Sequence, residues 1–149
     1  MKSLFETDTY TEVINRINKL SSTQPSKWGK MNVSQMLAHC KVAFGVPLSE
    51  KKLPRMTLGY ILGPLLKSQL YNDREWKKGT PTSPAFIIKD QRDFHIEKEG
   101  LKALIEKFYS SGPNGITKFP HPFFGKLTPD EWGKSMYKHL DHHFRQFGV

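Results

Sequence analysis

The chain has 149 residues, an aromatic content of 12%, one cysteine and a formal net charge of +9. Its length matches the commonest size of a single domain, about 100–150 residues, so we treat residues 1–149 as one domain. The aromatic content excludes a wholly disordered chain. The single cysteine excludes an internal disulfide framework and a multi-cysteine zinc site.

The positive charge alone suggests a nucleic-acid partner, because lysine and arginine neutralise phosphate backbones. The excess is spread along the chain, however: residues 1–50, 51–100 and 101–149 carry +2, +4 and +3. This pattern favours a surface with surplus lysine over a dedicated nucleic-acid interface. A basic module that binds nucleic acid or another anionic partner remains the alternative.

No segment predicts export or a membrane span. The N-terminus lacks the apolar region of a signal peptide, because Glu6 and Asp8 follow the first residues closely. The longest apolar-rich stretch, residues 56–66, has 11 residues, whereas a helix that crosses a bilayer needs about 20. Together with the single cysteine, these features predict a cytoplasmic protein.

The first half of the chain predicts three helical segments. Residues 8–21 have apolar side chains at helical spacing, and Thr9 with Glu12 predicts a capping box. A second helix is expected to begin near Asn32, with Gln35 completing its cap, and to end before Pro47. A third is expected over about 55–73, with a break near Pro64.

The second half predicts two further helices. A long connection over 77–92 leads to a helix around 96–108, which the residues 110–113 end. After a Gly/Pro/aromatic loop over 112–127, Thr128 caps a last helix, with Pro129 in its first turn and Glu131 completing a capping box. Only residues 85–88 could form a strand. We therefore expect an all-α four-helix bundle with an additional short or broken helix and long connections.

Two histidines fall on the apolar face of the last predicted helix. At 100° per residue, its apolar stripe contains His139 and His143 as well as the apolar residues Trp132, Met136, Leu140 and Phe147. The solvent side carries Lys134, Lys138, Asp141 and Arg145. Imidazoles at i and i+4 share one helix face, which is the geometry of many zinc-binding pairs. The alternative is a pair of core histidines bonded to backbone carbonyls or to each other.

The other histidines supply candidates for a third ligand and for catalysis. His39 lies at the edge of the apolar stripe of the second helix, which a bundle can bring close to the last one. His142 at the rim and His121 in the aromatic loop are the candidates for a general acid or base or a substrate contact. His95 is expected in solvent. Cys40 is interpreted as a small core residue.

Three segments resemble a known family. They are Trp28 with Met31-Asn-Val-Ser-Gln-Met-Leu-Ala-His39, His139-Leu-Asp-His-His143-Phe-Arg-Gln146, and the stretch from His121-Pro-Phe-Phe-Gly125 to Trp132. Together they resemble an uncharacterised branch of the DinB/YfiT-like superfamily of metal-dependent enzymes. The resemblance implies a four-helix bundle with one divalent ion, such as Zn, Ni or Fe, on His39, His139 and His143.

The resemblance also implies a function in outline. Members of the superfamily include transferases and isomerases that use low-molecular-weight thiols such as bacillithiol, mycothiol or glutathione. A small-molecule substrate, a hydrolase activity as a further option, and a homodimer are expected on the same ground. Many members follow the last ligand with Arg-Gly-Gln, whereas this chain has Phe144-Arg145-Gln146. Gln146 keeps its offset, but the glycine is missing, which weakens any transfer of substrate detail.

Overall fold

The protein is all-helical. A computed structural model describes residues 1–49, 52–80, 82 and 84–149, and none of these forms a strand. Five α-helices follow one another along the chain: α1 (Thr7–Asn18), α2 (Val33–Phe44), α3 (Thr57–Leu66), α4 (Phe94–Ser111) and α5 (Pro129–Gln146). Two short 3₁₀-helices, η1 (Lys67–Leu70) and η2 (Pro84–Phe86), lie between α3 and α4.

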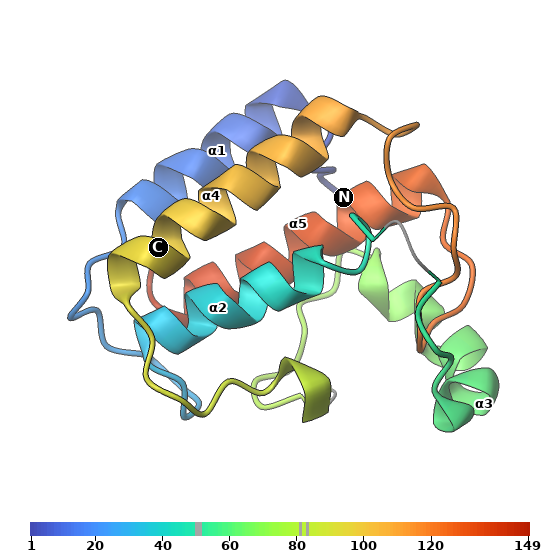
Figure 1. Cartoon of the computed structure of the whole chain (residues 1–149), viewed down its shortest axis with the longest axis horizontal. Helices are drawn as coiled ribbons and strands as arrows, with labels where there is room; N and C mark the ends of the chain where they lie inside the picture. The colour runs from blue at the N-terminus through green and yellow to red at the C-terminus, as the bar shows by residue number, and fades with distance from the viewer. Residues whose placement is uncertain (50–51, 81, 83) are drawn as a thin grey trace.

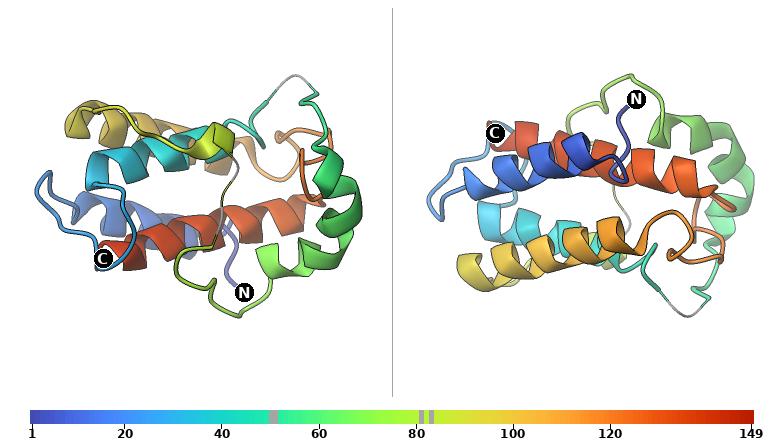
Figure 2. Two further views of the ribbon diagram at one scale, coloured as in Figure 1. Left: turned by 90° about the horizontal axis from the view of Figure 1, so that it is seen from below. Right: turned by 90° about the horizontal axis from the view of Figure 1, so that it is seen from above.

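Four of the helices lie side by side, and α3 stands at one end of the group (Figure 1). The α2 helix packs on α4 and contacts α5, while α1 packs on both α5 and α4. The two views of Figure 2 show the same grouping from below and above. The α5 helix also contacts η1, and α2 contacts η2. The long connection between α3 and α4 therefore reaches both helices that carry the candidate ligands.

The core is built from the apolar positions that face inward on these helices. Phe44 of α2 and Phe108 of α4 are fully buried, with ring centroids 5.7 Å apart and planes at 87°. This edge-to-face arrangement is preferred by aromatic pairs. On α5, the inner face buries Trp132, Met136 and Leu140, as the apolar pattern predicts, and it also buries Phe144. Burial of these side chains supplies the main driving force for assembly of the helices.

Capping residues set the starts of the two helices that carry the histidines. The Asn32 side chain accepts a hydrogen bond from the Gln35 N–H, and the Gln35 side chain accepts one from the Asn32 N–H. Thr128 and Glu131 form the same reciprocal pair at the start of α5. Both predicted capping boxes are confirmed, and each satisfies two N–H groups that a helix start leaves unpaired.

The predicted cap of the first helix is wrong. The α1 helix begins at Thr7 with Glu6 at its N-cap, so Thr9 lies inside the first turn. The Thr9 hydroxyl donates back to the Glu6 carboxylate over 3.1 Å. Glu12 instead pairs with Arg16 one turn later. Thr9 is buried at this position.

The third predicted helix is shorter than expected. The α3 helix ends at Leu66, and η1 carries the chain to Leu70, while Pro64 is accommodated inside α3. A β carbon at Gly59 or Gly63 would lie 2.5 or 2.2 Å from the Phe123 carbonyl oxygen. These glycines therefore let α3 lie directly against the 121–125 loop. The outer face exposes apolar side chains, namely Leu58, Tyr60, Ile61 and Leu65.

Among the helices that the structure describes, each is too short or too polar to cross a bilayer. The predicted strand-like segment 85–88 instead begins with η2 and continues without regular structure.

Candidate metal centre: three histidines between α2 and α5

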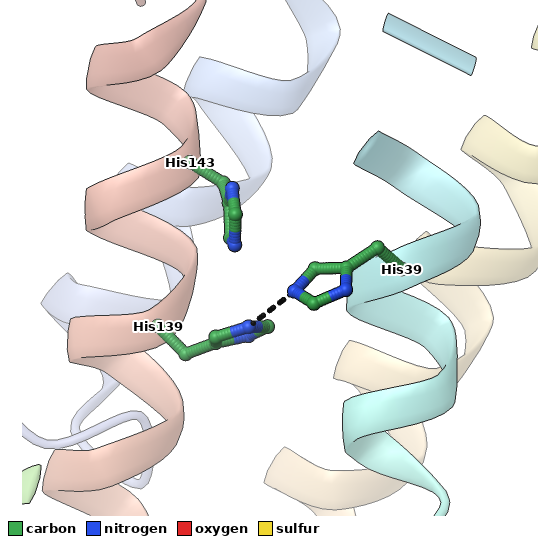
Figure 3. A group of neighbouring side chains, drawn as sticks. All are labelled: His39, His139 and His143. Atoms are coloured by element: carbon green, nitrogen blue, oxygen red, sulfur yellow. Dashed lines mark hydrogen bonds between the residues drawn. The ribbon is translucent and has the colours of Figure 1, made fainter. Parts of the chain in front are cut away.

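Three imidazole rings from two helices point toward one another (Figure 3). His39 comes from α2, and His139 and His143 come from successive turns of α5. One ring nitrogen from each residue lies within 4.8 Å of the other two. The Nε2 atoms of His39 and His139 lie 3.0 Å apart. The structure thus brings together the three histidines that the sequence analysis selects.

The helices hold these rings on their inner faces. His39 is 3% exposed and lies between core residues on α2, where Met36 and Cys40 are fully buried. His143 is 7% exposed. His139 retains some exposed surface, although its Nδ1 atom is buried. The i, i+4 spacing brings the two α5 rings together edge to face, with centroids 4.8 Å apart and planes at 78°.

Hydrogen bonds determine the tautomers of two of the rings. The His39 Nδ1 atom lies 2.8 Å from the Phe86 carbonyl oxygen in η2. Because a carbonyl only accepts, His39 must carry its proton on Nδ1. The neutral ring then presents an unprotonated Nε2 to the cluster. His39 Nε2 is therefore a lone-pair donor, as a metal ligand must be.

His143 is fixed in the same way by Gln146. The Gln146 amide nitrogen donates to the Trp28 carbonyl over 2.7 Å, so its oxygen faces His143. The His143 Nδ1 atom lies 2.8 Å from this oxygen and donates to it. The Nε2 atom of neutral His143 is therefore unprotonated as well. A metal-bound histidine usually has such a hydrogen-bond acceptor for the N–H on the ring nitrogen that does not bind the metal.

His139 has no comparable partner. Without a cation, its Nε2 must donate to His39 Nε2, which leaves Nδ1 as a buried acceptor. Among the described residues, none forms a hydrogen bond with this Nδ1 atom. An unpaired buried polar atom costs about 1–3 kcal/mol. Two Nε2 lone pairs and one Nε2 proton therefore face one another in the cluster, and moving that proton to His139 Nδ1 would present three lone pairs to a cation.

The electrostatics keep all three rings neutral. Burial lowers the pKa of His39, and burial with the neighbouring imidazoles lowers the pKa of His139 well below its usual value. Burial and the His39 ring lower the pKa of His143 to about 3. Metal ligation requires the unprotonated ring. At neutral pH these histidines need lose no proton before binding.

The donor set fits a divalent transition metal. Zn–N bonds of about 2.0–2.1 Å in a tetrahedral site place the nitrogens about 3.4 Å apart. The nitrogens of the cluster lie within 4.8 Å of one another, and the Nε2 atoms of His39 and His139 are 3.0 Å apart, so the cluster is near this spacing. Neutral imidazoles suit zinc, nickel or iron. Three protein ligands also leave a coordination position for water or substrate.

The other histidines lie in different surroundings. His142 adjoins the cluster, with its ring centroid 5.2 Å from that of His143, and packs between Trp28 and Trp76. His121 does not join the cluster: its Nδ1 accepts from the Phe123 and Phe124 N–H groups, and its ring packs on Trp132.

Two further predictions concern residues away from the cluster. His95 is exposed, as expected. Cys40 is fully buried with its thiol directed at Met36, and burial raises the pKa of that thiol.

The predicted solvent position of Lys138 is wrong. This residue is 5% exposed, and its ammonium donates to the Gln69 and Asn72 carbonyls and to the Asn72 side chain, at 2.7–2.8 Å. The segment after η1 covers α5 at this point. A helical wheel cannot show this because it contains no information about the segment that packs on the helix.

Sequence reasoning also missed the residues that support the ligands. Phe86 acts through its backbone oxygen, which leaves no trace in residue type. Gln146 was named only for its place in the family motif, although a glutamine three residues after His143 shares its helix face and could have been assigned this supporting role. Trp76 packs edge-on against His139, with ring centroids 6.0 Å apart. It lies in a segment that the sequence analysis leaves without a role.

Comparisons with curated proteins and with solved structures found no match. A family of proteins of unknown function, DUF1569, matches residues 2–148. Because the match covers almost the whole chain, this protein belongs to the DUF1569 family.

Proposed function

We propose that this protein is a metal-dependent enzyme that binds one divalent ion through His39, His139 and His143. The observation that carries the proposal is the convergence of these rings with unprotonated Nε2 atoms on His39 and His143. In the metal-free alternative, the histidines are core residues bonded to each other or to backbone carbonyls, and the Phe86 and Gln146 contacts fit that role as well. The metal proposal is preferred because it also gives a role to the Nε2 lone pairs of His39 and His143, which face the same cluster.

The chemistry follows from the kind of site. A divalent ion would act as a Lewis acid and lower the pKa of a bound thiol or water. The Phe86 carbonyl and the Gln146 side chain would hold two ligands in orientation. His142 lies beside the cluster, where its ring contacts that of His143. It is the proposed general acid or base. Burial and Arg145 lower the pKa of His142, so its ring is neutral at pH 7.

The proposal extends to fold family and substrate class. The lateral packing of α1, α2, α4 and α5 supports a four-helix bundle of the DinB/YfiT type. The resemblance supports a small-molecule substrate, with a thiol-dependent transferase or isomerase preferred and a hydrolase as the second option. It supports zinc, nickel or iron as the metal, and a homodimer as the assembly.

Metal titration tests the proposal directly. Purified protein stripped with a chelator should take up one equivalent of Co²⁺ or Zn²⁺ at neutral pH. His143→Ala should weaken this binding strongly. His95→Ala, which removes an exposed histidine from α4, is the matched control and should leave it unchanged. If wild-type protein binds no stoichiometric metal, the structural role is correct and the enzyme proposal fails.

A further inference from the structure

A hollow of about 370 Å³ opens beside the C-terminal end of α5. Its lining consists of Lys27, Trp28, Lys78, Arg145, Gly148 and Val149. Three of these six residues are cationic, and one is aromatic. No local sequence pattern predicts this grouping, because its members come from three separate segments of the chain.

Two of the cations are not neutralised by a carboxylate. Arg145 pairs with Asp141 over 2.9 Å and also with Glu75. In contrast, no carboxylate among the described residues lies within 4.0 Å of the Lys27 or Lys78 ammonium. The Lys78 ammonium instead lies 4.8 Å from the centre of the Trp28 ring. The hollow therefore has an uncompensated positive charge next to a flat apolar wall.

The hollow adjoins the histidine cluster through Trp28. The Trp28 carbonyl accepts from Gln146, which in turn accepts from His143. The Trp28 ring packs edge-on against His142, with centroids 5.9 Å apart. Arg145 follows His143 by two residues on α5. None of the three candidate ligands lines the hollow, so a small molecule there would contact Trp28, which packs on His142 next to the cluster.

We infer that this hollow binds the anionic group of the substrate, a carboxylate or a phosphate, through Lys27 and Lys78. The apolar part of the molecule lies against Trp28. Charge-assisted hydrogen bonds from ammonium groups suit both anions. The assignment to a substrate rests on the proposed metal centre, whereas the binding of an anion does not.

In the first test, phenyl phosphate or benzoate is titrated into metal-free protein at low salt. Binding is measured from the shift of the NMR signal of the Trp28 indole N–H. At least one probe should give a saturable shift, and phenol should give none. The probe with the tighter binding distinguishes phosphate from carboxylate. Lys27→Gln with Lys78→Gln should weaken binding at least tenfold, or about 1.4 kcal/mol.

A second double variant controls for net charge. Lys118→Gln with Lys126→Gln removes two exposed lysines from the loop before α5, at the opposite end of that helix. It should leave the binding constant within about twofold, since distant surface charges are screened. Equal weakening in both double variants, or no saturable shift in wild type, would overturn the inference.

Paramagnetic Co²⁺ separates this inference from the proposed function. In wild-type protein loaded with Co²⁺, the probe signals should broaden, and His143→Ala should abolish the broadening while the Trp28 shift persists. Probe binding without broadening in the loaded protein contradicts the substrate role. Failure to load Co²⁺ refutes the metal centre and the substrate role with it, while the shift in metal-free protein still decides whether the hollow binds anions.

Discussion

Gln146 accepts the Nδ1 proton of His143 over 2.8 Å and thereby fixes which nitrogen of that ring faces the cluster. Its own orientation is set by the Trp28 carbonyl, to which its amide donates over 2.7 Å. A glutamine that is 3% exposed thus links the 27–28 segment to a candidate metal ligand. The ring orientation of His143 depends on this chain of two hydrogen bonds.

Removing the glutamine should weaken metal binding. Gln146→Ala leaves His143 free to rotate and to change tautomer, and the loss of such a partner typically lowers metal affinity about 10–100-fold. A competition titration with a chromophoric chelator measures the change. Gln91→Ala, at an exposed position, is the control. Unchanged affinity in Gln146→Ala would show that the glutamine does not position the ligand.

A methyl group at Gly29 should disturb the same contact from the other side. Gly29 has φ +83°, and a β carbon there would lie 2.6 Å from the Gln146 amide nitrogen. Gly29→Ala should therefore displace Gln146, lower metal affinity and destabilise the fold. The left-handed backbone alone costs about 1–2 kcal/mol for a residue with a side chain.

Gly79 provides a control that separates backbone strain from the steric conflict with Gln146. It has φ +72°, and a β carbon there would meet no atom within 4 Å. Gly79→Ala should lower the unfolding free energy by the backbone cost only and leave metal affinity unchanged. Urea unfolding and the chelator competition together measure both effects. Equal affinities in the two variants would mean that Gln146 tolerates the intrusion.

Acid should destabilise the metal-free protein. Burial and Arg55 lower the pKa of His121 to about 4, from an ordinary value of 6.5. Between these values the unfolded chain binds a proton that the folded chain does not, so stability is full above pH 6.5 and falls as pH drops toward 4. The shift corresponds to about 3 kcal/mol from this one residue.

An asparagine at position 121 isolates this contribution. His121→Asn keeps an acceptor for the Phe123 and Phe124 N–H groups but cannot titrate. Its unfolding free energy should therefore depend less steeply on pH between 6.5 and 4 than that of wild type. Urea unfolding in the presence of EDTA at several pH values gives both slopes. Parallel curves would show that folding does not shift the pKa of His121.

Lys138 should contribute more to stability than a neighbouring surface lysine. Lys138→Met keeps most of the apolar stem but leaves the carbonyls of Gln69 and Asn72 without their donor. Loss of a partner for buried polar atoms costs about 1–3 kcal/mol. Lys134→Met, one turn earlier on α5, removes an exposed pair with Asp130 and should cost much less. Equal urea unfolding midpoints for Lys138→Met and Lys134→Met would contradict this role of Lys138.

Local patterns predicted the helices and two of the three candidate ligands well. Asn32 with Gln35 and Thr128 with Glu131 carry their capping information within four residues. His139 and His143 were assigned to the inner face because the apolar period of α5 is regular. His39 needed the family resemblance as well, since a helix edge does not determine which partner helix packs there.

The features that were missed depend on contacts between distant segments. Lys138 is buried by residues about 66–69 positions earlier in the chain, and the Trp28 carbonyl that holds Gln146 lies 118 positions away. No periodicity encodes such pairs. The hollow beside Arg145 is of the same kind, because the three segments that line it meet only in the folded chain.

Anomalous diffraction from crystals grown with Zn²⁺ tests the central claim most directly. The account predicts one strong peak among His39, His139 and His143, with all three Nε2 atoms at about 2.0–2.1 Å from it. It also predicts that His39 Nδ1 and His143 Nδ1 keep their bonds to Phe86 and Gln146. Crystals with no peak at this cluster, or with zinc only at surface residues, would contradict the account.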